Sequence, residues 1–312
     1  MTATDTIAPG SVLRERPEDA HVEVGPVELF FDLVYVLTII QLSHTLLEHL
    51  TWRGALETLV LFLAVWWAWN YSAWALNWID PDNTRVRLLV GVMMLSAFGM
   101  AVALPHAFAE DAGLFVGGYV LLQLIRSGFM VAAFDGVDAT MRRNYAQLLS
   151  WSLLASAFWV AGVFVEDQAR LVLWIAAVAV DYLAPFVGFW LPGRGATDME
   201  SWTLRPEHLA ERNRLVFIIA LGETVLITGG LLSDMELNAA VVTAAIVGFV
   251  LLFCLWWNYF NPDVEPSAND QRRTEAGRNA YAYAHAAMVG GAIVVAVAIE
   301  KITAHPGGHV DA

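Results

Sequence analysis

Cysteine and charge are both scarce in this chain. Cys254 is the one cysteine among 312 residues, which excludes a disulfide framework and a cysteine-based metal site. Only 15% of the residues are charged, compared with about 25% in typical soluble domains. Acidic residues outnumber basic ones by 31 to 17, and a formal net charge of −14 would repel a phosphate backbone, so nucleic acid is excluded as a partner.

Motifs for cofactors and for enzymatic chemistry are also missing. The chain contains no nucleophile elbow, phosphate-binding loop, zincin motif or dinucleotide fingerprint. His305 and His309 flank a Pro-Gly-Gly segment that cannot hold a helix, so their spacing does not indicate a zinc site. We therefore predict no metal and no cofactor, and the sequence assigns no catalytic residue.

Apolar residues are abundant instead. They make up 58% of the chain, against about 45–50% on average, and the mean hydropathy is +0.55. This excess predicts an all-α, polytopic integral membrane bundle surrounded by the lipid bilayer, because a helix of about 20 apolar residues satisfies its own backbone inside lipid. Nine segments have the required length, at about 27–48, 55–79, 86–109, 113–134, 145–165, 169–191, 208–232, 238–260 and 278–302.

The basic residues predict the orientation of these helices. Residues 1–26 are polar, carry five acidic residues and lack the features of a signal peptide, so we expect the first apolar segment to remain as a helix. With nine spans, thirteen of the 17 basic residues lie on the side of the N-terminus, and Arg53, Arg170 and Lys301 lie on the other. Short loops rich in Arg and Lys stay inside the cell, which places the N-terminus in the cytoplasm and the C-terminus outside.

Two short blocks recur along the chain. Residues 33–36 resemble 215–218 at an offset of 182, and 77–82 resemble 258–263 at an offset of 181. Six helices separate the matching blocks, which predicts a parallel internal repeat in which helices 1 and 2 are echoed by helices 7 and 8. The second copy is then incomplete, and the chain looks short. The predicted organisation is a cytoplasmic segment 1–26, a first six-helix repeat 27–191, a cytoplasmic loop 192–207, a second repeat of three helices 208–302 and a tail 303–312.

Ionisable residues inside the predicted spans are the main candidates for function. They are Asp32, Arg126, Asp181, Glu223 and His285. Each costs about 2.5–3.5 kcal/mol on insertion scales, so such groups face a bundle interior or a watery cavity. Arg126 stays protonated and needs a carboxylate, for which the three acids are the available partners. One cation against three acids favours the binding of a proton or another cation. A purely structural salt-bridge network is the alternative.

Helix 1 presents further candidates on one face. Glu28, Asp32 and Tyr35 share this face, and Glu28 also suits the positive end of the helix dipole. Gln41 lies farther along the same helix and corresponds to Glu223 in the repeat. We expect these residues to contribute to an ion-binding or substrate-binding site.

The remaining candidates lie on other helices. Asp181 precedes Pro185, which should kink its helix beside the carboxylate. His285 could titrate near neutral pH or be hydrogen-bonded in the core. Trp67 belongs to the aromatic run 66–74, which suits interface anchoring and packing, and a stacking or cation-binding wall is the alternative.

Several motifs occur in an order that resembles a known family. The matching segments are Val27–Val34, Gln41–His44, Trp66–Trp69 and Ile219–Glu223. Together they are similar to the bacterial low temperature requirement A (LtrA) family over residues 26 to about 300. The family's second block usually opens with Glu-Arg-His, whereas here Glu211 and Arg212 are followed by Asn213. The resemblance implies an integral protein of the bacterial inner membrane, linked to growth in the cold and commonly continued by further helices, and it implies no particular reaction.

Two functions of different class follow from these residues. The first is a transporter or channel, in which Asp32, Asp181 and Glu223 couple to a proton, a cation or a small molecule while Arg126 is the fixed counter-charge. The second is an intramembrane enzyme acting on a lipid or isoprenoid substrate. A large closed apolar pocket would favour the enzyme, and a polar path to one aqueous side would favour transport. A non-transporting stress or cold-adaptation protein is the third interpretation.

Overall fold

The computed structural model describes residues 11–14, 24–202, 204–261 and 275–305, and within these ranges the fold is all-helical. Most of the predicted N-terminal segment, Pro262 and Asp263 of the second repeated block, and the last seven residues of the predicted tail lie outside them. The α-helices are α1 (Pro26–Glu48), α2 (Trp52–Leu76), α3 (Thr84–Ala103), α4 (Ala112–Ala133), α5 (Ala139–Val163), α6 (Asp167–Phe186), α7 (Pro206–Asp234), α8 (Ala239–Tyr259) and α10 (Glu275–Ala304). Two short 3-10 helices, η1 (Leu104–His106) and η2 (Met199–Trp202), complete the described elements.

The predicted membrane-spanning helices are confirmed. In the described residues, nine helices are long and apolar enough to cross a bilayer, so the protein is a multi-pass membrane protein. Several boundaries differ from the prediction by a few residues, and two of them have a clear local cause. Helix α5 begins at Ala139 rather than near 145, because the Asp138 side chain accepts hydrogen bonds from two backbone N–H groups of the first turn. Helix α6 ends at Phe186 rather than near 191, directly after Pro185, so this proline lies in the last turn of the helix.

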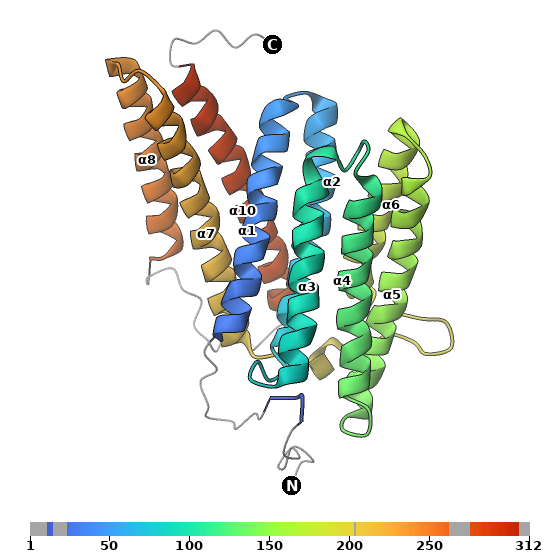
Figure 1. The fold of residues 1–312 in the computed structure, drawn as a ribbon. Helices are drawn as coiled ribbons and strands as arrows, with labels where there is room; N and C mark the ends of the chain where they lie inside the picture. Colours follow the sequence, from blue (N-terminus) through green and yellow to red (C-terminus); the bar gives the residue numbers. More distant parts are fainter. Residues whose placement is uncertain (1–10, 15–23, 203, 262–274, 306–312) are drawn as a thin grey trace.

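Helix directions alternate through the bundle (Figure 1). Helices α1, α3, α5, α7 and α10 all begin at the end where α1 begins, which we call the Pro26 end. Consecutive helices from α3 to α6 pack against one another, and α1 joins this part of the bundle to α7 and α10. Helix α8 contacts α7 and α10 at the periphery. The α1–α7 interface is therefore a junction between the first six helices and the last three described ones.

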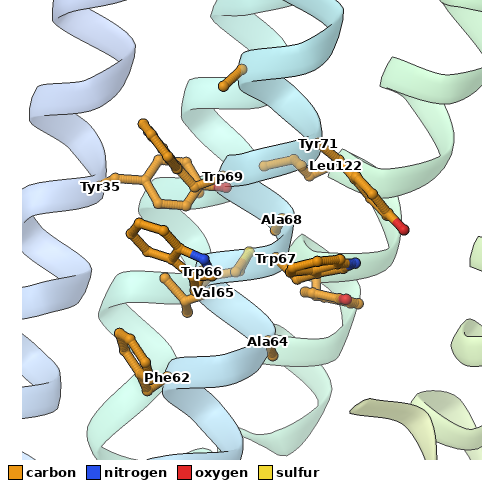
Figure 2. Packing of buried hydrophobic residues seen from close by; sticks show 14 of the residues in the cluster. Tyr35, Phe62, Ala64, Val65, Trp66, Trp67, Ala68, Trp69, Tyr71 and Leu122 are labelled. Atoms are coloured by element: carbon orange, nitrogen blue, oxygen red, sulfur yellow. The ribbon is translucent and has the colours of Figure 1, made fainter. Parts of the chain in front are cut away.

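Helix α2 is the central element. In the most apolar 18-residue stretch of α2, 89% of the residues are buried, whereas the corresponding stretch of α8 has 17% buried. Figure 2 shows Trp66 and Trp69 on the side of α2 that faces Tyr35 of α1, and Trp67 and Tyr71 on the opposite side. The Trp66 indole N–H donates to the Ala282 carbonyl of α10. The tryptophan run therefore packs α2 on all sides against other helices.

The α5–α6 contact yields a prediction about stability. A Cβ atom added at Gly162 of α5 would overlap the Trp174 indole of α6. Gly162→Ala should therefore lower the free energy of unfolding by about 1–3 kcal/mol, because the indole is buried and cannot move aside. Gly117→Ala in α4 is the matched control, since nothing lies within 4 Å of the added atom. Thermal unfolding in detergent measures both variants, and equal melting temperatures would contradict the predicted overlap.

Candidate functional site at the α1–α7 interface

Glu28 closes the first turn of α1. Pro26 occupies the first helical position, and the Gly25 backbone N–H donates to Glu28 Oε2 over 2.8 Å, so the carboxylate caps the helix as its position near the dipole's positive end suggests. The same carboxylate meets His208 Nε2 of α7 at 3.1 and 3.2 Å. Both side chains have no exposed surface. Glu28 is therefore a buried link between two helices as well as a cap.

Asp32 lies one turn deeper in α1 and is held by Arg212 of α7. The Arg212 Nε–H donates to Asp32 Oδ2 over 3.2 Å, and Nη2 donates to Oδ1. The Trp69 indole N–H donates to Oδ1 as well, over 2.7 Å. The Arg212 guanidinium also lies 5.5 Å from the Trp69 ring and 5.8 Å from the Phe31 ring. This fully buried, bidentate pair is geometrically well satisfied on the carboxylate side.

The two pairs form one ladder. Glu28 and Asp32 are four residues apart on α1, and His208 and Arg212 are four apart on α7, so each set lies on one helix face. The helices both begin at the Pro26 end and run side by side, which brings acid against base twice. We call these four residues the α1–α7 charge ladder.

Asn77 fixes the proton position on His208. The Asn77 amide accepts from the Arg205 backbone N–H at 3.0 Å and donates to the Arg205 carbonyl at 3.1 Å, and these backbone partners define its orientation. Its Nδ2 also lies 3.2 Å from His208 Nδ1. Because Nδ2 is a donor, Nδ1 must accept, and the neutral imidazole carries its proton on Nε2, where it faces Glu28.

A second polar cluster lies deeper, between α4 and α6. The Tyr119 hydroxyl donates to Asp181 Oδ2 over 2.6 Å, and Gln123 Nε2 donates to the Tyr119 oxygen over 2.9 Å. All three side chains are buried. Asp181 is therefore held by a hydroxyl rather than by a direct ion pair, and Arg126 acts on it electrostatically from a longer distance.

The chain is similar to a known protein family. The sequence model of the family described as bacterial low temperature requirement A protein (LtrA) matches residues 23–312. The chain belongs to the LtrA family. A relative from Rhizobium meliloti (strain 1021), described as the uncharacterized protein RA0937, is 35% identical over 284 residues, which cover 89% of this chain and 69% of that protein. No solved structure matches this LtrA-family chain.

Arg126 occupies a different environment from the predicted one. Its Nη1 donates to the Ala68 carbonyl at 3.3 Å, its Nη2 donates to the Ser127 hydroxyl at 3.2 Å, and the guanidinium lies 5.3 Å from the Tyr71 ring. Within the described residues, no carboxylate comes within 4 Å of it. The expectation that Arg126 pairs directly with an acid is therefore wrong, and Asp32 pairs with Arg212 instead.

The other predicted site residues are distributed over the bundle. Glu223 is 9% exposed and interacts electrostatically with His44 of α1. It lies in the half of α7 that is farther from the Pro26 end. His285 of α10 meets the Tyr259 hydroxyl of α8 at 2.8 Å. The structure thus does not gather these two residues with the α1–α7 charge ladder. Their role in binding stays a prediction.

The supporting residues also separate. Tyr35 is buried one turn beyond Asp32, with its ring 5.0 Å from Phe31. Trp67 is stacked on Tyr182, at 4.2 Å, and on Tyr283, at 5.3 Å, and these two tyrosine rings also lie 5.8 Å from each other. Gln41 lies on α1 and is partly buried. Glu211 and Arg212 lie on α7, where Glu211 is also partly buried and Arg212 belongs to the charge ladder. Of this group, Arg212 carries the main contact of the site.

Sequence reasoning missed His208 and Asn77. Arg212 lies close to the start of α7, so it is absent from the ionisable residues that the sequence places inside the spans. The signal that identifies the ladder is the spacing His208-x-x-x-Arg212, which matches Glu28-x-x-x-Asp32 at an offset of 180. The histidine that the family's second block usually places after Glu-Arg is absent, but His208 lies one turn earlier on the buried face.

The buried Asp32–Arg212 pair yields a prediction about stability. Asp32→Asn leaves the Arg212 charge without a counter-ion, so the free energy of unfolding should fall by about 3–5 kcal/mol. Arg212→Gln should act similarly, and the double variant should lose less than the sum of the two. The measurement is a denaturant titration in micelles, followed by tryptophan fluorescence.

The exposed Asp82–Arg87 ion pair is the matched control for that experiment. Its side chains are 85% and 55% exposed, so Asp82→Asn should change stability by less than about 1 kcal/mol. A similar loss in Asp32→Asn and Asp82→Asn would show that the buried pair contributes no more than a surface one.

Proposed function

We propose that this LtrA-family protein is a proton- or cation-coupled transporter or channel of the bacterial inner membrane. One observation carries the proposal: the α1–α7 charge ladder, in which two acid–base pairs have no exposed side-chain surface. Charged groups inside a membrane protein are costly, and they mark ion pathways more often than structural contacts do. The ladder also joins the two parts of the bundle that would have to move against each other during transport.

The two pairs of the ladder have different chemistry. Arg212 keeps its proton at all working pH values, so the charge of Asp32 is permanently balanced. Glu28 and His208 can both bind a proton, so their pair can take up one positive charge without losing contact. We therefore assign proton coupling to Glu28 and His208, and a fixed structural charge to Asp32 and Arg212.

Proton uptake can change helix contacts through Asn77. When His208 is neutral, the Asn77 amide donates to its unprotonated Nδ1. A proton added at Nδ1 would bring two donors together and weaken the contact between the end of α2 and α7. A proton can shift a conformational equilibrium only if the two conformations bind it with different affinity.

The predicted parallel repeat forms part of this proposal. Glu28 meets His208 and Asp32 meets Arg212, so residues separated by 180 face each other twice. Pro26 and Pro206 begin the two helices at the same spacing of 180, which is two residues less than the offset that relates 33–36 to 215–218 in these helices. The contact therefore joins the first helices of the two proposed copies, which would meet at an axis along the membrane normal, but at neighbouring rather than equivalent positions.

The alternative enzyme hypothesis receives no specific support. A cavity of about 330 Å³ lies at the Pro26 end, and four of its eight lining residues are charged: Arg14, Asp80, Asp82 and Arg87. It is partly open, and charged residues make up half of its lining, unlike a closed apolar chamber for a lipid substrate. This observation favours transport over lipid chemistry.

Proton flux through the protein tests the proposed function. In vesicles containing the purified protein and an internal pH-sensitive dye, an imposed pH gradient should dissipate faster than in protein-free vesicles. Glu28→Gln removes the titratable acid but retains its hydrogen-bonding shape, so flux should fall to the protein-free rate. Glu57→Gln is the control, because Glu57 forms an ion pair with Arg53 at the opposite end of the bundle. Undiminished flux in Glu28→Gln would remove the ladder from the transport path.

Cysteine labelling tests the proposed orientation, in which the Pro26 end faces the cytoplasm. Val137 and Glu110 lie in loops at opposite ends of the bundle and are both well exposed. In a Cys254→Ser background, an impermeant thiol reagent added outside intact cells with a permeabilised outer membrane should label Glu110→Cys and spare Val137→Cys. The reverse pattern would invert the assignment.

A further inference from the structure

A four-residue strap covers the Pro26 end of the bundle. Residues 11–14 pair with the turn after α2: the Arg14 N–H donates to the Trp78 carbonyl at 2.8 Å, and the Asp80 N–H donates to the Val12 carbonyl at 2.9 Å. Leu13 is only 6% exposed and belongs to the hydrophobic core. The strap is therefore attached both by backbone hydrogen bonds and by a buried side chain.

Arg14 places a charge between the cavity and the charge ladder. Its Nη2 lies 3.4 Å from Glu28 Oε1, and its side chain is 12% exposed. Arg14 also lines the 330 Å³ cavity together with Gly25, whose backbone N–H donates to the other oxygen of Glu28. Two of the groups that hold Glu28 thus line the cavity, while Glu28 itself has no exposed surface.

The acids of the cavity are already engaged, which limits what the cavity can bind. Asp80 accepts the Asp82 backbone N–H at 3.0 Å, and Asp82 forms an ion pair with Arg87 at 2.7 Å. Burial and the Arg14 charge both lower the pKa of Arg205, so Arg14 and Arg205 are two positive charges that act on each other at this end of the bundle. In the described residues no group of three acidic, histidine or cysteine side chains is placed to hold a metal ion. A metal cation would meet repulsion and lack ligands, whereas a proton needs only water to carry it.

We infer that this cavity is the aqueous entrance through which protons reach Glu28, and that Arg14 of the strap is its gate. The inference rests on the proposed proton coupling and narrows the coupling ion to the proton. The groups that face Glu28 are Arg14 on the strap, His208 and Arg212 on α7, and Asp32 on its own helix. With Arg14 in place, Glu28 is shielded from the cavity. When Arg14 swings away, the carboxylate meets water and can bind a proton.

Chemical modification of the native carboxylate tests the gate without measuring transport. The purified full chain is treated with a water-soluble carbodiimide and glycine ethyl ester, and the modification of Glu28 is followed by peptide mass spectrometry. Asp82, which is 85% exposed in the cavity wall, reports that the reagent has entered. In the parent protein, Asp82 should react quickly and Glu28 slowly.

Two matched arginine variants separate gating from general loosening. Arg14→Gln should accelerate the modification of Glu28 about tenfold or more, because the charged contact that closes the cavity is lost. Arg87→Gln removes the same charge from another cavity wall without touching Glu28, and should change that rate by less than about twofold. Equal rates in the parent and in Arg14→Gln, or equal acceleration by both variants, would overturn the gate. If Arg14→Gln does not fold, Leu13→Asp detaches the strap instead and should give the same acceleration.

An ion-substitution arm tests the choice of the proton. In Arg14→Gln, replacing a choline salt by a sodium or potassium salt should leave the modification of Glu28 unchanged, since no alkali ion occupies the carboxylate. Protection by either ion would overturn the proton assignment in favour of a metal cation. A negative gating result combined with loss of flux in Glu28→Gln rejects the gate and keeps the transporter. If Arg14→Gln accelerates the modification of Glu28 but the protein shows no proton flux, the gate is kept and the transporter is rejected.

Discussion

A carboxylate inside a membrane bundle is stable only where an opposite charge or several donors meet it, and this requirement determines how α1 and α7 come together. Removing an ion from water costs several kcal/mol, and the attraction to a partner offsets that cost only in good geometry. Asp32 has such geometry, with two donors from Arg212 and one from Trp69. Because these donors come from α7 and α2, the charge requirement brings three helices to one point.

The same requirement explains why the site lies at a junction. Helices α3 to α6 pack mainly through apolar and aromatic side chains, and in the described residues α1 and α2 connect them to α7. A contact made of two acid–base pairs has fewer alternatives than an apolar one, since any sliding of α7 by one turn would leave one acid and one base buried without partners. The ladder therefore fixes the register between the two parts of the bundle.

Composition and hydropathy were sufficient to predict the class of fold and the nine spans, because a bilayer demands about 20 apolar residues per helix. Helix ends such as those of α5 and α6 depended on the cap at Asp138 and on Pro185, which hydropathy does not capture. The acids Glu28 and Asp32 were recognised from their position on one helix face. Their partners were not, because Arg212 lies close to a helix start and a partner 180 residues away cannot be inferred from local spacing.

The central position of α2 has a consequence for the order of assembly. The Trp66 indole bonds to a carbonyl of α10, and the Trp69 indole bonds to Asp32, whose counter-ion is on α7. During synthesis α2 leaves the ribosome long before either of those helices exists. At that stage Trp69 can already bond to Asp32 of α1, but the Trp66 indole N–H lacks the Ala282 carbonyl and Asp32 lacks its counter-ion. The first six helices therefore cannot reach their final packing until the last ones have been inserted.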